Sequence, residues 1–262
     1  MTAQTVVIKI GGSTLGHGDT SLSDMVALHA RGTNVVVVHG GGAEVSSWLS
    51  RLGMESRFVD GLRVTGDEEL RVVTAVLAGL VNKLLVAQLL AYGGKALGLS
   101  GVDGGLVRAA ITNPGLGNVG EITGVEPQAL NALLSSGFIP VVSPVCWNPA
   151  GVSGGLLNVN ADDVAAEVAI AIEATSLVYL TDVPGILDAE GQVIPRIAAH
   201  DVEPLISAHT IRGGMIPKAR ACMRASRYMP QTRIIDGTVA HALLREDEAN
   251  PGGTTIVTDE LA

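Results

Sequence analysis

Short runs of apolar, largely β-branched residues alternate along the chain with longer stretches in which apolar residues recur every three or four positions. The short runs predict strands, and the longer stretches predict amphipathic helices. We expect strands at residues 5–10, 34–42, 95–101, 138–145, 176–187, 232–237 and 253–258, of which the second ends in three glycines, the third in a glycine loop and the fifth in a turn. We expect helices at residues 21–30, 43–52, 65–91, 127–137, 161–172 and 213–228. Because the strands are continuously apolar, they indicate a parallel sheet covered on both faces, and therefore an α/β fold.

Three local patterns refine these elements. Residues 65–68, Thr-Gly-Asp-Glu, have capping-box spacing, so we expect Thr65 to cap the long helix that follows. Asn160 is placed to cap the helix at residues 161–172. Residues 106–124 predict a β-hairpin around a turn that contains proline and glycine.

The composition is that of a large globular protein. The chain has 262 residues, is 47% hydrophobic and only 3% aromatic, so its core is expected to be aliphatic. It shows no internal repeat or low-complexity linker. We expect one domain made of two intimate lobes, residues 1–175 and 176–262, with the boundary between a helix and the next strand near residues 173–176.

Charge and targeting signals narrow the functional classes. The net charge of −9 argues against sequence-independent nucleic-acid binding, which needs a basic surface. No stretch of about 18 uninterrupted apolar residues predicts a membrane span, and no basic segment followed by an apolar one predicts a signal peptide. Cys146 and Cys222 lie far apart and are expected to be buried or free thiols in a reducing compartment. These features together predict a cytoplasmic protein.

Two motif matches have the wrong context for the chemistry that they usually indicate. Residues 115–120 match the dinucleotide-binding pattern GxGxxG, but they lead into a strand rather than a helix, so we interpret them as a hairpin turn. Residues 151–155 match the hydrolase pattern GxSxG, but no strand precedes them and no helix follows. The six histidines show no zinc-binding spacing, and His39 is interpreted as a strand-end residue that hydrogen-bonds locally.

Glycines recur where the predicted strands end, at Gly11-Gly12, at Gly40-Gly41-Gly42, and within residues 98–105. Such glycines shape tight turns, but they also expose backbone N–H groups to an anion next to a helix N-terminus. Because several lie at the same predicted sheet edge, where α/β proteins bind ligands, they favour phosphate or carboxylate binding.

Lys9 lies inside an otherwise apolar strand, two residues before the first of these glycine pairs, Gly11-Gly12. A buried lysine must be paired or neutral, since burying an unpaired charge is very costly. A lysine directed at a phosphate at the open sheet edge satisfies that requirement.

Seven segments together resemble the amino-acid kinase family, and within it the acetylglutamate kinases. They are KIGGS (9–13), VVVHGGG (36–42), DGLRVT (60–65), AGLVNK (78–83), NVNAD (158–162), YLTDVPGILD (179–188) and GGMIPK (213–218). They occur in the family's order and span nearly the whole chain.

The resemblance implies a three-layer αβα sandwich around a mainly parallel open sheet, with the amino-acid substrate in the N-terminal lobe and ATP in the C-terminal lobe. It implies phosphorylation of N-acetyl-L-glutamate by ATP to N-acetyl-L-glutamyl 5-phosphate, the second step of arginine biosynthesis. In the family, ATP transfer needs Mg²⁺, which phosphate oxygens can largely hold, so we assign the metal no protein ligand.

The resemblance also implies roles for individual residues. Lys9 and Lys218 would stabilise the transferring phosphoryl group, and Asp162 would orient the two lysines. The substrate would contact the backbone N–H groups of Gly41 and Gly42 and the side chains of Arg63, which clamps its α-carboxylate, and Asn158. The ATP site would contain Gly11, Gly12, Asp182, Val183, Pro184, Gly185, Ile186, Leu187, Thr210, Ile211, Arg212, Gly213, Gly214, Met215, Ile216, Pro217 and Lys218.

These residue types suit phosphoryl transfer. Its transition state spreads charge over oxygens, so positioned ammonium groups stabilise it. The substrate γ-carboxylate has a pKa near about 4.3 and is ionised at neutral pH, so no general base is required.

Other functions stay open at this point. A kinase for carrier-linked aminoadipate in lysine biosynthesis shares the fold and the lysines, and glutamate, aspartate and UMP kinases are more distant alternatives. Arg63 and Asn158 favour acetylglutamate. A non-catalytic amino-acid-binding domain, as in acetylglutamate synthases, is disfavoured because both lysines are present and no acetyltransferase domain follows residue 262. Because Met1 lies only four residues before the first strand, without the extra helix of arginine-regulated hexamers, we expect an arginine-insensitive homodimer.

Overall fold

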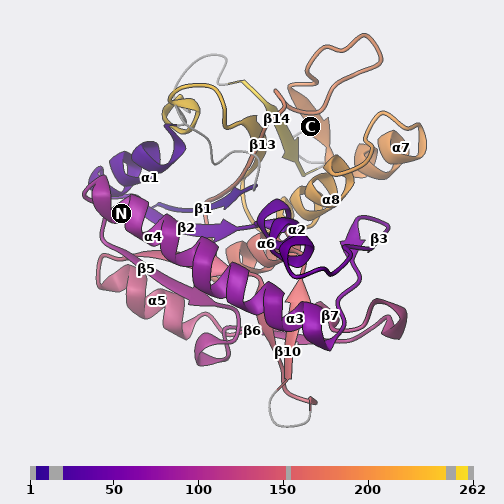
Figure 1. The fold of residues 1–262 in the computed structure, drawn as a ribbon. Coiled ribbons are helices and arrows are strands. Elements are labelled where there is room, and N and C mark those ends of the chain that lie inside the picture. Colours follow the sequence, from indigo (N-terminus) through magenta and orange to yellow (C-terminus); the bar gives the residue numbers. More distant parts are fainter. Residues whose placement is uncertain (1–3, 12–19, 152–154, 246–251, 259–262) are drawn as a thin grey trace.

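The computed structural model describes residues 4–11, 20–151, 155–245 and 252–258, and Figure 1 shows their arrangement. A central sheet has eight strands in the order β12-β14-β13-β11-β1-β2-β8-β5. All neighbours run parallel except β13 and β14. The bounds are β1 Thr5–Ile10, β2 Asn34–His39, β5 Ala96–Ser100, β8 Ile139–Ser143, β11 Ser176–Thr181, β12 Arg196–Ala198, β13 Gln231–Asp236 and β14 Thr254–Val257. The predicted α/β fold is confirmed.

Helices cover both faces of this sheet. Those longer than one turn are α1 Ser21–Ala30, α2 Gly42–Arg51, α3 Asp67–Thr74, η1 Ala75–Val81, α4 Asn82–Ala91, α5 Gln128–Ser135, α6 Ala161–Ala171, α7 Val202–Ser207 and α8 Met215–Ala225. Short 3₁₀ turns are η2 Asp103–Gly105, η3 Pro114–Leu116, η4 Ala199–Asp201 and η5 Ala242–Leu244. The expected helices all form, whereas α7 and strand β12 were not expected.

The core is split into two apolar clusters by the sheet. On one face, alternate strand residues such as Ile8 and Val37 pack against α1, α2 and the long helix α3–η1–α4. On the other face, Val7 and Val36 pack against α5, α6 and α8. Since successive strand residues point to opposite faces, each central strand contributes to both clusters. The result is the expected three-layer αβα sandwich.

The long helix Asp67–Ala91 is long and apolar enough to cross a membrane by length and composition, and 39% of its most apolar window is buried. Leu85 and Leu89 are buried in the core, and the helix packs against β5 and β8. It runs across the front of the molecule in Figure 1. We interpret it as a core helix of the sandwich rather than a membrane span.

Four further strands form a small closed barrel beside the sheet: β6 Val107–Ala110, β7 Val119–Val125, β9 Val145–Asn148 and β10 Gly155–Val159. The antiparallel pairing of β6 with β7 confirms the predicted hairpin, and residues 115–120 lie in its connection and the start of β7. The closure by β9 and β10 was not expected. A two-stranded hairpin, β3 Phe58–Val59 and β4 Leu62–Arg63, lies between α2 and α3.

The predicted capping box is wrong. The N-cap of α3 is Gly66, and no side chain caps the helix. The hydroxyl of Thr65 instead donates to the carbonyl of Arg63 at 2.9 Å. Its backbone pairs with residues 116–118, so Thr65 is held by tertiary contacts. The Asn160 cap is confirmed, because its side chain accepts from the Asp162 N–H at 2.9 Å.

Candidate active site

The carboxyl ends of β1 and β2 lie side by side, and a glycine turn follows β2. The turn after β2 contains Gly41, whose φ of 143° strongly favours glycine. A Cβ at this position would lie 2.8 Å from Leu77 Cδ2 and 3.3 Å from Val81 Cγ2. The turn therefore packs directly against the π-helical segment η1 before it enters α2.

Asp162 lies between two lysines that are 209 positions apart in the chain. Its Oδ1 is 2.7 Å from Lys9 Nζ, and its Oδ2 is 3.1 Å from Lys218 Nζ. The Lys9 contact is a buried ion pair, and Lys218 also donates to the Gly214 carbonyl at 3.3 Å. Lys9 from β1, Asp162 from α6 and Lys218 from α8 thus form one charged cluster, as the sequence predicts.

Burial and charge shift the pKa values of Lys9 and Asp162. Burial lowers the pKa of Lys9, with a further lowering by Lys218, while Asp162 acts in the opposite direction. Burial alone would raise the pKa of Asp162, but the two lysines hold it below its ordinary value. The carboxylate therefore stays ionised. With two ammonium groups and one carboxylate, the cluster carries an excess positive charge that suits an anion.

A cavity of about 290 Å³, which we call the first cavity, adjoins this cluster. Its lining includes eight of the predicted site residues: Gly41, Gly42, Arg63, Asn158, Asp162, Gly214, Pro217 and Lys218. Helices α2, α6 and α8 begin at its wall, at Gly42, Ala161 and after Gly214. Because helix N-termini carry exposed N–H groups and a partial positive charge, the cavity favours anionic ligands.

Arg63 is buried at 7% exposure on this wall and already has partners. Its Nη1 donates to Ser56 Oγ at 2.7 Å, and its Nη2 donates to Ser46 Oγ and the Gly42 carbonyl, both at 2.8 Å. The guanidinium also lies 4.6 Å from the ring centre of Phe58. These contacts fix the plane of the guanidinium. Burial lowers the pKa of Arg63, but the ordinary pKa of arginine is so high that the side chain stays charged.

Asn158 lines the first cavity from β10. Its Nδ2 donates to Thr65 Oγ1 at 3.1 Å, which joins the barrel to the segment before α3. Among the described residues, no hydrogen bond to the amide oxygen of Asn158 is formed, so this oxygen can accept from a substrate N–H.

Two further cavities lie on the C-terminal side. The second, of about 310 Å³, is lined by the predicted residues Gly11, Asp182, Val183, Arg212, Gly214, Met215 and Lys218. The third, of about 460 Å³, is lined by the predicted residues Val183, Gly185, Ile186, Leu187, Thr210, Arg212 and Met215. Lys218 and Gly214 line both the first and the second cavity, so Lys218 lies where the two spaces adjoin.

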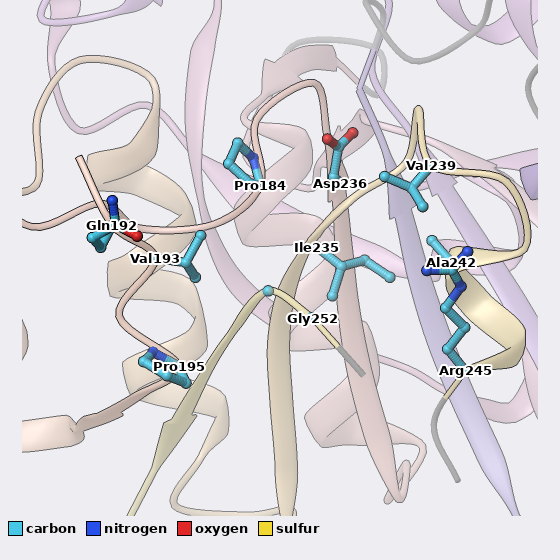
Figure 2. Close-up of a pocket in the computed structure, with 11 residues that line it drawn as sticks. Pro184, Gln192, Val193, Pro195, Ile235, Asp236, Val239, Ala242, Arg245 and Gly252 are labelled. Atoms are coloured by element: carbon cyan, nitrogen blue, oxygen red, sulfur yellow. The ribbon is translucent and has the colours of Figure 1, made fainter. Parts of the chain in front are cut away.

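The remaining predicted residues lie elsewhere. Pro217 lines the first cavity, whereas Pro184 lines a fourth cavity of about 400 Å³, in which Figure 2 shows it on the same side as Val193 and Pro195. None of these four cavities is lined by Ile211, Gly213 or Ile216, and Ile211 belongs to the core. Gly12 lies outside the described residues.

Residues 4–236 match the model of the amino acid kinase family. The chain belongs to the amino acid kinase family.

Individual family members are similar over nearly their whole length. The chain is 44% identical over 260 residues to the acetylglutamate kinase of Dehalococcoides mccartyi, covering 98% of this chain and 95% of that protein. It is 44% identical over 273 residues to the acetylglutamate kinase of Carboxydothermus hydrogenoformans, covering 97% and 92%. A crystal structure of a Streptococcus mutans protein superposes with a TM-score of 0.84 at 28% identity, covering 97% and 98%.

Some residues of this amino acid kinase site were not found from the sequence. Ser46 and Ser56 hold Arg63, and Tyr179 donates a 2.7 Å hydrogen bond from its hydroxyl to the Asp162 carbonyl. Serines are common on helices and in loops, so no pattern distinguishes these two. Tyr179 lies opposite Lys9 in the β1–β11 register, a relationship that a predicted strand order would have revealed.

Two other sequence interpretations are confirmed in this amino acid kinase. His39 is fully buried at the end of β2 and hydrogen-bonds locally, with Nδ1 2.8 Å from the Gly40 carbonyl. Cys146 and Cys222 are buried free thiols whose pKa values are raised by burial. Residues 152–154 of the GxSxG match lie outside the described residues.

Proposed function

We propose that this amino acid kinase is an acetylglutamate kinase. It transfers the γ-phosphoryl group of ATP to the γ-carboxylate of N-acetyl-L-glutamate and forms N-acetyl-L-glutamyl 5-phosphate, the second step of arginine biosynthesis. The observation that carries the proposal is the Lys9–Asp162–Lys218 cluster beside the first cavity. The identity of 44% to acetylglutamate kinases over nearly the full length supports the choice of substrate.

The two lysines act on the transferring phosphoryl group. Lys9 and Lys218 place ammonium groups on either side of Asp162, and Lys218 lines both the first and the second cavity. Charge on the phosphoryl oxygens grows toward the transition state, and fixed positive groups in a buried site stabilise it. Asp162 keeps the two like charges together until the phosphates enter between them.

The acyl-amino acid occupies the first cavity. The N–H groups of Gly41 and Gly42, at the N-terminus of α2, bind the γ-carboxylate and the incoming phosphoryl oxygens. Arg63 binds the α-carboxylate, for which its planar fork is suited, and Asn158 binds the acylated amino group. The nucleophile is already ionised, so the reaction needs no base.

ATP occupies the second and third cavities. Its phosphates extend toward Gly11, Lys218 and the N-terminus of α8, and its nucleoside lies between residues 182–187 and 210–215. Among the described residues, no group of three or more His, Cys, Asp and Glu side chains is arranged to hold a metal ion. Mg²⁺ fits here as a partner of the ATP phosphates, where it offsets phosphate charge, while the side chains orient the nucleotide.

The assembly and the lobe roles belong to the same proposal. Residues 1–175 bind the amino acid and residues 176–262 bind ATP. The protein is a cytoplasmic homodimer. Exposed leucines of the long helix support association, because Leu80, Leu84 and Leu90 are 36%, 55% and 52% exposed.

The test is acyl-phosphate formation trapped with hydroxylamine. The protein is incubated with ATP, Mg²⁺ and, in parallel, N-acetyl-L-glutamate, free L-glutamate or N-acetyl-aminoadipate. We expect hydroxamate from N-acetyl-L-glutamate and little from the other two. Hydroxamate mainly from the aminoadipate derivative would reassign the substrate, and none from any of the three would overturn the proposal.

A further inference from the structure

We propose that His39, supported by Asn82, is a positioning residue that locks the Gly40–Gly41 peptide so that the Gly41 N–H faces the first cavity. The inference rests on the proposed function, since it concerns the glycine turn that binds the acceptor carboxylate. Neither side chain lines the first cavity, so both act through the backbone.

The hydrogen bonds assign the state of the imidazole. Its Nδ1 lies 2.8 Å from the Gly40 carbonyl oxygen, which can only accept, so Nδ1 carries the proton. Its Nε2 lies 3.1 Å from Nδ2 of Asn82, which can only donate. A neutral imidazole with one donor and one acceptor satisfies both contacts.

The orientation of Asn82 is fixed at both ends of its amide. Nδ2 also lies 2.9 Å from the carbonyl of Val141 and 3.2 Å from that of Leu99, so this atom must be the NH₂ group. Oδ1 accepts from Lys83 Nζ at 3.0 Å. A flipped amide would place its oxygen against two carbonyl oxygens and its NH₂ against an ammonium group. Asn82 therefore holds His39 in one tautomer.

Because the peptide bond is planar, holding the Gly40 carbonyl also fixes the direction of the Gly41 N–H. In a trans peptide the C=O of one residue and the N–H of the next point in opposite directions. Because His39 holds the Gly40 carbonyl on the buried side, the Gly41 N–H is directed to the opposite side, where Gly41 lines the first cavity. Within the described part of the chain, that N–H donates to no backbone carbonyl. A run of three glycines would otherwise permit this peptide to rotate.

The π-helical segment places the supporting residues. Segment η1 ends at Val81, so Asn82 is the first residue after it. Leu77 and Val81 of the same segment lie against the position where Gly41 would carry a Cβ. π-helical turns are rare and frequently occur at functional sites. Here one such turn presents apolar contacts to one side of the glycine turn and the amide of Asn82 to His39.

The imidazole serves as a fixed hydrogen-bonding group rather than a base. Burial lowers its pKa to about 4, with further lowering by Lys9 and Lys83 and an opposing effect of the Gly40 hydrogen bond. It is fully buried and neutral at physiological pH. A neutral imidazole carries no charge to hold the two lysines together, as Asp162 does. The buried ring also does not remove a proton from substrate.

Two substitutions separate hydrogen bonding from packing. In His39→Asn the amide nitrogen can take the place of Nδ1 and keep the bond to Gly40, although the smaller side chain leaves a void. In His39→Gln the amide reaches toward Asn82 and fills more volume but loses the Gly40 bond. The control is His29→Phe, since His29 Nε2 contacts the Gly137 carbonyl at 3.2 Å, a histidine–glycine contact on α1.

We expect His39→Gln to lower kcat/KM for N-acetyl-L-glutamate by at least about tenfold, since a misdirected donor costs on this scale or more. We expect the KM for ATP to stay within about twofold, His39→Asn to keep most of the activity, and His29→Phe to resemble the parent enzyme. A purely packing role predicts the reverse order, with His39→Asn the more damaged, and that result would overturn the inference.

A measurement on the unaltered protein covers the case in which His39→Gln does not fold. Long-range ¹H–¹⁵N NMR spectra report which ring nitrogen carries the proton, and comparison with His39→Asn assigns the His39 signals. The proposal requires an Nδ1–H tautomer at pH 7, and an Nε2–H tautomer contradicts it. If the parent enzyme does not phosphorylate N-acetyl-L-glutamate, the proposed function fails. The tautomer measurement still tests whether His39 holds the Gly40–Gly41 peptide.

Discussion

The Tyr179 hydroxyl donates a 2.7 Å hydrogen bond to the backbone carbonyl of Asp162, the residue whose side chain joins Lys9 and Lys218. Tyr179 and Lys9 are register partners on the adjacent strands β11 and β1. Both side chains therefore reach the first turn of α6 from the same face of the sheet. One binds the backbone of Asp162 and the other its carboxylate, so the sheet fixes both the position and the charge of this residue.

Replacing Tyr179 by Phe removes the bond to Asp162 and leaves a buried carbonyl without its donor. We expect the free energy of unfolding to fall by about 1–3 kcal/mol. We also expect kcat to fall several-fold, with the KM for N-acetyl-L-glutamate nearly unchanged, because the lysines lose their alignment. Urea unfolding and steady-state kinetics measure both effects. The control is Tyr228→Phe at a side chain that is 68% exposed, and equal behaviour of the two variants would contradict this role.

Replacing Asp162 by Asn removes the carboxylate that holds the two ammonium groups together. We expect kcat to fall by at least about 10²-fold, on the scale of losing a fixed electrostatic group. Stability is expected to fall by about 3–5 kcal/mol, since breaking a buried ion pair leaves uncompensated charge. Asp163→Asn is the matched control, because its carboxylate pairs with Arg224. A variant Asp162→Asn that keeps the parent rate would refute the ascribed function of this cluster.

His39 is expected to make stability sensitive to acid. Its folded pKa of about 4 lies below the ordinary value of 6.5, so the unfolded chain binds more protons between these two pH values. The free energy of unfolding therefore falls as pH is lowered from about 6.5 to 4, by up to about 3 kcal/mol for this group. His39→Asn lacks the titration, so the stability advantage of the parent protein should shrink over this window. The measurement is urea unfolding of both proteins from pH 7 to pH 4. If the difference between their free energies of unfolding stays constant over this range, His39 does not titrate as described.

Gly41→Ala tests the fit between the glycine turn and η1. The new Cβ would meet Leu77 Cδ2 at 2.8 Å, at a backbone φ of 143°. We expect a loss of stability above the ~1–3 kcal/mol typical of backbone strain alone, together with an increased KM for the acceptor. Gly53→Ala, with φ of 74° and open space around the position, is the control for strain without a clash. If both variants lose the same stability, the proposed close packing is wrong.

The exposed leucines of the long helix predict the oligomeric state. We expect light scattering to give twice the chain mass of 26.8 kDa. Leu84→Glu places a charge at one of these exposed leucines and should shift the protein toward monomers, whereas Tyr228→Glu, on an exposed position after α8, should not. A parent protein that is monomeric at micromolar concentration would contradict the homodimer.

The order of strands and helices could be predicted from the spacing of apolar residues, because each apolar run is long enough to distinguish a strand from a helix. The Thr65 cap failed because tertiary partners, the Arg63 carbonyl and the turn at residues 116–118, bind Thr65 more specifically than the helix end does. The four-stranded barrel was missed because β9 and β10 are short and pair, besides each other, with the more distant strands β6 and β7.

The site residues could be predicted where they lie in segments that resemble those of the kinase family. Lys9, Asp162 and Lys218 come together as expected, and Arg63 and Asn158 line the same cavity. The support of Arg63 by two serines and of the glycine turn by His39 and Asn82 could not be predicted. These contacts depend on side-chain directions across elements, and the π-helical turn that directs Asn82 leaves no pattern in the sequence.

The most direct test of the central claim is the turnover number of Lys9→Ala with N-acetyl-L-glutamate, with ATP affinity measured by calorimetry on the same preparation. If Lys9 stabilises the transferring phosphoryl group, the variant binds ATP but kcat falls by about 10²–10³-fold. A variant that is folded, binds ATP and turns over at the parent rate would show that the buried lysine of β1 does not act on the phosphoryl group.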